Sequence, residues 1–184
     1  MQKQILSLLL GTTLLFAITG CSGKKQVASV NNVGTFQTTD IYGNTVTEDI
    51  FRDYDLTVIN TWATGCSPCI DEMPDLAELS ELYKDKKVQI IGIVHDVADP
   101  KKGIVDEELL YLAQDIVERT GVNYPVLLPD NSLNEGLLAN TMGYPDTAFV
   151  DSTGELVGIS ILGSQDMESW KEIIDERLAM SKGE

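Results

Sequence analysis

Two cysteines separated by two residues stand where a predicted strand passes into a predicted helix. The apolar, β-branched run Leu56–Thr61 predicts a buried strand, and an amphipathic helix is expected from Cys66 to about Lys84. The first amide groups of a helix lack intrahelical partners, and the helix dipole adds about half a positive charge there. A thiolate at Cys66 is therefore favoured, with a pKa below the free value of about 8.5. Cys69, one turn further in, is placed to attack a mixed disulfide formed at Cys66, so the pattern predicts a nucleophile and its resolving partner.

Two other interpretations of this cysteine pair remain open at the level of sequence. A structural zinc site needs four ligands, and beyond this pair the chain offers only His95 and Cys21. An inert structural disulfide would also use both sulfurs. The position of the pair at the start of a helix favours redox chemistry over either alternative, because that position activates a thiol.

The first residues have the pattern of a bacterial export signal. Lys3 supplies a positive start, and the apolar run Ile5–Ile18 is too short for a membrane span, which needs about 20 residues. Ile18-Thr19-Gly20-Cys21 has the pattern of a lipobox, in which the cysteine is lipidated after cleavage; an ordinary cleaved signal is the alternative. We therefore expect a signal peptide at residues 1–20, a lipidated Cys21 with a tether at 21–34, and a folded domain at 35–184.

The charge balance narrows the range of partners. The chain carries 29 acidic and 13 basic side chains, and loss of Lys3 with the signal would leave a net charge of −17. Nucleic-acid binding needs clustered Lys and Arg, so a nucleic-acid partner is not expected. Nor do we expect a cofactor or a bound metal, and the chain is expected to be a monomer.

Alternating strand and helix patterns predict an α/β fold with a mixed sheet. A hairpin is expected within Thr35–Ile50, a buried strand at Val88–Val94, a loop at Ala98–Gly103 and a helix at Asp106–Thr120. The inward face of that helix is expected to carry Leu109, Leu112, Ala113, Ile116 and Val117. Further on, the sequence predicts a strand within Tyr124–Pro129, a helix capped by Ser132 and Glu135, a hairpin from Phe149-Val150 to Leu156–Ile161, and a last helix over Gln165–Ser181.

Two motifs resemble those of a known family. The first is Trp62-Ala63-Thr64-Gly65-Cys66-Ser67-Pro68-Cys69 with Glu72-Met73-Pro74, and the second is Gly143-Tyr144-Pro145-Asp146-Thr147-Ala148-Phe149-Val150-Asp151 with Gly154-Glu155. From about Gly34 to Leu178 the chain resembles the membrane-tethered thioredoxin-like oxidoreductases of the TlpA/ResA type. Gly65 departs from the family pattern, which usually has a bulky residue before the first cysteine.

This resemblance implies a thioredoxin-like fold in which an N-terminal β-hairpin flanks the core. It also implies a cis peptide bond at Tyr144–Pro145 facing the cysteines, with Trp62, Tyr144 and Pro145 in contact with substrate. An acidic residue at the position of Glu72 belongs to the family's active site. A partly buried carboxyl has a raised pKa and can accept the proton of Cys69, although a solvated Glu that only favours the helix dipole is the alternative.

The predicted activity is thiol–disulfide exchange with disulfide-containing exported proteins. The resemblance favours reduction of the partner, and in an oxidising compartment this direction needs electrons from a membrane donor of the CcdA/DsbD type. Three other functions remain open: an SCO-type copper protein, a peroxiredoxin-like peroxidase and a purely ligand-binding lipoprotein. The spacing of the cysteine pair argues against the first two, and the third leaves both motifs unexplained.

Overall fold

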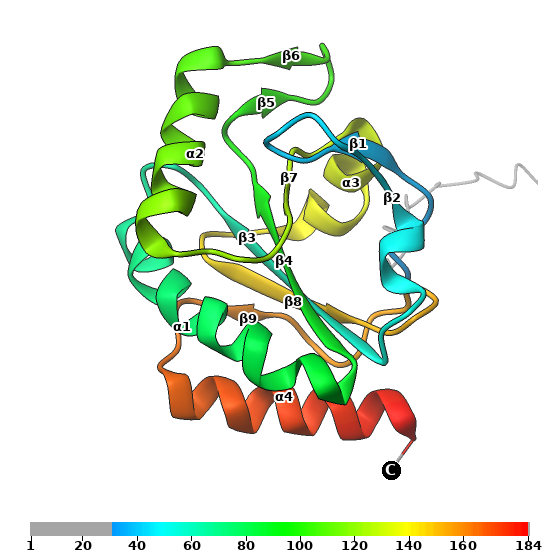
Figure 1. Cartoon of the computed structure of the whole chain (residues 1–184). Helices are drawn as coiled ribbons and strands as arrows, with labels where there is room; N and C mark the ends of the chain where they lie inside the picture. Colours follow the sequence, from blue (N-terminus) through cyan, green and yellow to red (C-terminus); the bar gives the residue numbers. More distant parts are fainter. Residues whose placement is uncertain (1–30, 184) are drawn as a thin grey trace, which may run out of the picture.

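The structure is a computed structural model that describes residues 31–183. A five-stranded mixed sheet forms its centre (Figure 1). The strand order is β7-β4-β3-β8-β9. The bounds are β3 at Leu56–Trp62, β4 at Val88–Val94, β7 at Val126–Leu127, β8 at Asp146–Val150 and β9 at Ile161–Leu162. Strand β4 runs parallel to β3 and β7, whereas β8 is antiparallel to β3 and to β9. The predicted mixed sheet is thus confirmed.

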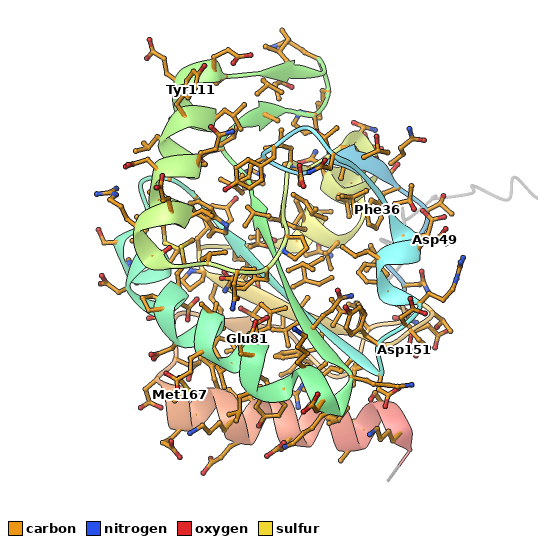
Figure 2. All side chains as sticks on the ribbon, in the orientation of Figure 1. Phe36, Asp49, Glu81, Tyr111, Asp151 and Met167 are labelled. Carbon is orange, nitrogen blue, oxygen red and sulfur yellow. A yellow bond between two sulfur atoms is a disulfide. The ribbon has the colours of Figure 1, made fainter. Side chains whose placement is uncertain are left out.

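Helices and short elements cover the two faces of this sheet. On one face lie α1 at Ser67–Tyr83, α2 at Glu107–Thr120 and α4 at Met167–Lys182. The other face is covered by the hairpin of β1 at Gln37–Thr39 and β2 at Thr45–Thr47, by the 3₁₀ turn η1 at Glu48–Phe51, by α3 at Asn131–Glu135 and by the 3₁₀ turn η3 at Leu137–Asn140. Two short elements complete the list, the 3₁₀ turn η2 at Lys84–Lys86 and the hairpin of β5 at Ala98–Asp99 with β6 at Ile104–Val105. Side chains from both layers fill the space around the sheet (Figure 2).

The central strands consist mostly of apolar and β-branched residues and are covered on both faces. Every residue of β3 and of β4 is buried, as expected for neighbouring parallel strands that are covered on both sides. Val58 packs in the cluster beneath α1, whereas Ile59 packs in the cluster beneath the hairpin. The predicted strands are therefore confirmed. The cysteine pair follows shortly after the end of β3.

Local capping fixes the helices next to the sheet. The side chain of Asp106 accepts hydrogen bonds from the first turn of α2, and Gly121 ends this helix at a φ of 72°. Helix α1 begins after Cys66 with Pro68 in its first turn, where a missing N–H costs nothing. It also continues through Pro74.

Four details differ from the sequence-based predictions. The expected loop after Ala98 contains the β5–β6 hairpin, and Leu112 of α2 is 40% exposed. Asp130 rather than Ser132 caps α3, because its carboxylate accepts the N–H of Leu133 at 2.8 Å. Of the predicted second hairpin strand, Leu156 bridges to Val150 of β8, but the paired strand β9 begins only at Ile161, the last residue of the prediction.

The folded domain begins before the predicted boundary at residue 35. Asn31 accepts the N–H of Leu156 at 2.8 Å, and the N–H of Val33 donates to Gly154 at 2.9 Å. Val33 is also buried, so residues 31–34 belong to the domain and not to the tether. The predicted signal peptide and Cys21 lie outside the described residues. Within residues 31–183, no helix has the length and apolar character needed to cross a bilayer.

Candidate active site

The two cysteines are joined by a disulfide at the start of α1. Their Cα atoms are 5.3 Å apart. Cys66 occupies the N-cap position with extended backbone and is half-buried, whereas Cys69 is fully buried. Because only Cys66 is accessible, a partner can reach this sulfur first, which is the asymmetry that the sequence predicts for a nucleophile and a resolving cysteine.

An acidic residue that sequence reasoning missed holds the segment before Cys66. The N–H of Thr64 donates to both carboxylate oxygens of Asp96, at 3.1 and 3.0 Å, and the Thr64 hydroxyl donates to Oδ2 at 2.7 Å. Asp96 follows the end of β4, next to β3 in the sheet. The two residues are 32 positions apart in the sequence, so no local sequence pattern predicts this contact.

The loop from Met142 to Pro145, called the proline loop, lies beside the segment that precedes Cys66. The Tyr144–Pro145 peptide bond is cis, as the resemblance implies, and Pro145 is buried. The Tyr144 ring packs against the same apolar cluster as Cys66, with its centroid 5.4 Å from that of His95. Burial raises the pKa of Tyr144, and the negative charges of Asp96 and Asp146 raise it further. Tyr144 therefore lies at a rim that carries negative charge.

Glu72 is buried in a network of hydrogen-bond donors. Its carboxylate accepts bonds from Asn60 Nδ2 at 2.9 Å, from the N–H of Gln165 at 3.1 Å and from Trp170 Nε1 at 3.3 Å. Asn60 Nδ2 also donates to the hydroxyl of Thr147 at 3.0 Å. Burial raises the pKa of Glu72, and these hydrogen bonds oppose the rise. The solvated Glu that was the alternative interpretation is excluded, because Glu72 is only 3% exposed.

Two buried tryptophans lie at or near the site. Trp170 packs in the core, and its indole N–H also donates a hydrogen bond to Glu72. Trp62 was expected to contact substrate, but the last position of β3 turns its side chain into the core, where its exposure is 0%. A direct contact between Trp62 and a partner is therefore ruled out in this conformation.

Gly65 leaves open space at the rim. A Cβ atom built there meets no other atom within 4 Å. The bulky residue usual at this position could thus be accommodated, and its absence widens access to Cys66. No group of three or more Cys, His, Asp or Glu side chains is arranged to hold a metal ion in residues 31–183.

Comparison with known proteins identifies the family. A family model described as AhpC/TSA matches residues 31–159, which is more than half of the chain. The chain belongs to the AhpC/TSA family.

Curated relatives of this AhpC/TSA member include two thiol-disulfide oxidoreductases named ResA. The protein from Geobacillus kaustophilus is 28% identical over 155 residues, which cover 82% of this chain and 80% of that protein. The protein from Halalkalibacterium halodurans is 29% identical over 118 residues, which cover 63% of this chain and 60% of that protein.

Solved structures share the fold at lower identity. A thiol:disulfide interchange protein from Chlorobium tepidum is 19% identical with a TM-score of 0.66, and the match covers 82% of this chain and 98% of that one. An exposed lipoprotein thioredoxin from Streptococcus pneumoniae is 23% identical with a TM-score of 0.57, covering 78% and 99%. The predicted thioredoxin-like fold with its N-terminal hairpin is confirmed, as is the class of enzyme, a thiol–disulfide oxidoreductase of the ResA type.

Proposed function

We propose that this AhpC/TSA member is a membrane-tethered oxidoreductase that works outside the cytoplasm and reduces disulfides in partner proteins. The observation that carries the proposal is the disulfide at the start of α1, in which Cys66 is accessible and Cys69 is fully buried. This arrangement suits a sulfur that exchanges with partners and a second sulfur that reacts only within the chain.

The reaction starts from the reduced pair and proceeds in two exchanges. The Cys66 thiolate attacks one sulfur of the partner's disulfide; a new S–S bond forms, the old one breaks, and the other partner sulfur leaves as a thiolate. The Cys69 thiolate then attacks Cys66 and releases the second partner thiolate. Two electrons pass from the cysteine pair to the partner, and the chain is left in the oxidised form that the structure shows.

Glu72 is proposed to accept the proton of Cys69 before the second exchange. The two residues are three positions apart on α1, a spacing that places side chains on the same face of a helix. A carboxyl whose pKa is raised by burial is a better proton acceptor near neutral pH than an exposed one. Asn60, Gln165 and Trp170 would hold this carboxyl in place through their hydrogen bonds.

Tyr144 and Pro145 are proposed to hold the partner during these exchanges. A cis X-Pro bond leaves the backbone groups of the preceding residue free to pair with an extended segment. The half-buried ring of Tyr144 packs in the same cluster as Cys66, which supports a role beside the exchanging sulfur.

Location and partners follow from the sequence pattern at the N-terminus. Lipidation of Cys21 would tether the domain, and the solved relative from Streptococcus pneumoniae is itself described as an exposed lipoprotein. The substrates are proposed to be exported proteins with disulfides. Since their compartment is oxidising, a membrane donor of the CcdA/DsbD type is proposed to return electrons to a monomeric chain.

Trapping of a mixed disulfide tests this function. Cys69→Ser should accumulate a thiol-reducible covalent adduct with the natural partner, because nothing resolves the bond at Cys66. Cys66→Ser is the matched control and should accumulate little, because Cys69 is buried. Equal trapping by both variants, or more by Cys66→Ser, would show that Cys66 is not the nucleophile.

A further inference from the structure

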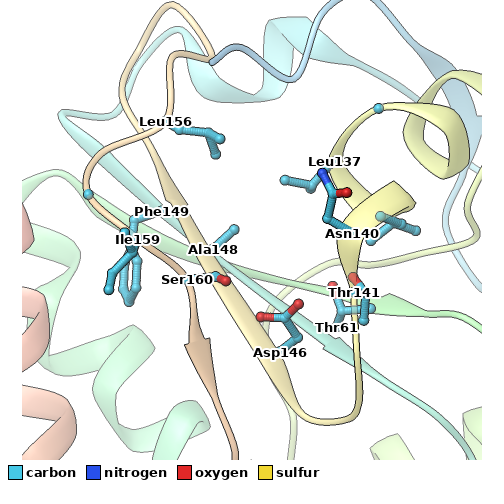
Figure 3. Close-up of a pocket in the computed structure, with 13 residues that line it drawn as sticks. Thr61, Leu137, Asn140, Thr141, Asp146, Ala148, Phe149, Leu156, Ile159 and Ser160 are labelled. Carbon is cyan, nitrogen blue, oxygen red and sulfur yellow. The ribbon is translucent and has the colours of Figure 1, made fainter. Parts of the chain in front are cut away.

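A groove of about 300 Å³ lies under the proline loop, on the face of the sheet that carries α3 and η3. It runs along β8 between η3 and the segment that follows Leu156 (Figure 3). Leu137, Ala148, Leu156 and Ile159 make much of its wall apolar, and Asp146 lies at the end next to the cis peptide. The groove therefore starts beside the site that exchanges disulfides but lies outside the cysteine pair itself.

The side chain of Asp146 lines this groove. Its Oδ1 is buried and has no hydrogen-bond partner among residues 31–183, and Figure 3 shows the carboxylate directed into the space between Ser160 and Thr141. None of the described residues that line the groove is basic. A carboxylate in a groove whose described lining has no basic side chain is complementary to a ligand that brings a hydrogen-bond donor, and above all a cation.

A second carboxylate extends the negative charge toward Cys66. Asp96 binds Thr64, and the charges of Asp96 and Asp146 both act on Tyr144, so the two carboxylates flank the residue before the cis-proline. No ion pair to either carboxylate is formed within the described part of the chain. The net charge of −16 points the same way, because it attracts basic partners over longer distances.

Exposed apolar side chains lie in the lining of the groove or next to lining residues: Ile159 lines it, Met142 follows Thr141 in the chain, and Leu162 pairs with Asp146. Met142 is 88% exposed, Ile159 is 77% exposed and Leu162 is 54% exposed. Met142 belongs to the proline loop, and a Cβ at neighbouring Gly143 would lie 3.6 Å from Leu162 Cδ1. Apolar side chains exposed together in this way are typical of a surface that a partner covers.

We propose that this groove binds an extended segment of the partner protein that carries Lys or Arg next to an apolar residue. The cation would pair with Asp146, and the apolar side chain would pack against Ala148 and Leu156. The proposal rests on the proposed function and names its substrate class: disulfides whose flanking residues are basic. The groove would supply affinity and selectivity, while the exchange would take place at Cys66.

The experiment uses three synthetic peptides, each with one internal disulfide. They differ only at the two residues that flank this disulfide, which are both Lys in the first peptide, both Gln in the second and both Glu in the third. The full-length chain should reduce the Lys peptide with a kcat/KM about tenfold above that for the Glu peptide at low salt, with most of the difference in KM. High salt should shrink this ratio. Rates are compared with those toward a small neutral disulfide.

Three variants separate the groove from a general charge effect. Asp146→Asn should bring the Lys-to-Glu ratio close to one, whereas Ile159→Ser should weaken all three peptides and keep the ratio. Asp85→Asn is the matched control, because it removes the same charge from an exposed position of η2. Asp85 forms no ion pair within residues 31–183, and its replacement should leave the ratio unchanged. An equal loss of selectivity in Asp85→Asn would overturn the assignment to the groove.

A binding measurement keeps this proposal separate from the redox function. Peptides with both cysteines replaced by Ser should bind the oxidised full-length chain in the order Lys, Gln, Glu, and Asp146→Asn should remove the order. Equal rates and equal binding for the three peptides would refute the groove and leave the proposed function intact. If binding followed the order but no peptide were reduced, the proposed function would fail instead, and with it the substrate class, leaving the groove as a binding site alone.

The same binding assay distinguishes two other occupants. Neutralising Lys24 and Lys25 together should leave binding of the Lys peptide unchanged; a several-fold increase would show that the chain's own N-terminal segment fills the groove and would overturn the proposal. An apparent Kd that rises with protein concentration would indicate a second copy and would also overturn it.

Discussion

Replacing Glu72 by Gln should stabilise the oxidised domain at neutral pH and leave its stability unchanged in acid. Burial raises the pKa of Glu72, so the folded state holds this proton more tightly than the unfolded chain does. The resulting contribution to stability is complete below the unfolded pKa, about 4.3, and is lost as the pH rises through the folded pKa. A glutamine resembles the protonated carboxyl and does not titrate, so it escapes this loss.

The network around Glu72 sets the size of the competing hydrogen-bond effect. Glu72→Ala would leave three donors without their acceptor, on Asn60, Gln165 and Trp170, and at roughly 1–3 kcal/mol for each donor the loss is about 3–9 kcal/mol. Glu72→Gln should avoid most of this cost. Asn60 Oδ1 has no partner in residues 31–183, so a flip of the Asn60 amide would present that oxygen to the new NH₂ group, and the Thr147 hydroxyl can donate to it.

Urea unfolding of the oxidised chain between pH 4 and pH 8 measures these effects. The stability of Glu72→Gln relative to the native chain should rise with pH and then level off, by about 1.4 kcal/mol for each unit of pKa shift that NMR titration of Glu72 gives. Glu72→Ala should be destabilised at every pH. A difference between Glu72→Gln and the native chain that does not vary with pH, or greater stability of the native chain at pH 7, would refute the assignment of a raised pKa.

Three further outcomes are expected. Glu72→Gln should slow turnover near neutral pH and change the pH–rate profile, and identical profiles would mean that Glu72 handles no proton. Cys21→Ala should release or misprocess the protein in cells while the purified domain keeps its thiol chemistry, and unchanged membrane retention in cell fractionation would rule out the lipid anchor. Gly158→Ala should cost about 2–4 kcal/mol in urea unfolding, because a Cβ there lies 2.7 Å from Arg177 Nε at a φ of +72°, whereas the control Gly163→Ala, at φ +92° in open space, should lose only about 1–2 kcal/mol.

Those parts of the fold that local chemistry specifies were predictable from the sequence. Strands β3 and β4 follow from continuous apolar runs, and α2 is bounded by its own capping residues, Asp106 and Gly121. The cysteine pair was predictable for the same reason, since its chemistry depends on the start of one helix.

Contacts between distant parts of the chain were not predictable in this way. Helical periodicity places Trp170 on the inner face of α4, but Glu72 lies 98 residues earlier, and nothing in the spacing indicates that the two meet. The bonds from Thr64 to Asp96 have the same character. Trp62 shows the converse error: a residue next to a functional motif was assigned a contact, although it ends a strand that is buried on both faces.

The arrangement around β8 separates the point of attachment from the redox site. Pro145 immediately precedes this strand, whereas Asn31 and Val33 bond to Leu156 and Gly154, just beyond its other end at Val150. A five-residue strand spans about 17 Å, so an anchor at Cys21 would hold the domain by the end remote from the cysteines. Soluble partners could then reach Cys66 without rotation of the domain, but a donor within the membrane could not.

The ten residues from Cys21 to Val30 extend to at most about 36 Å, comparable to the size of the domain. We therefore infer that the length of this segment, more than its sequence, would decide whether Cys66 of one tethered chain can reach both soluble partners and an electron donor in the membrane.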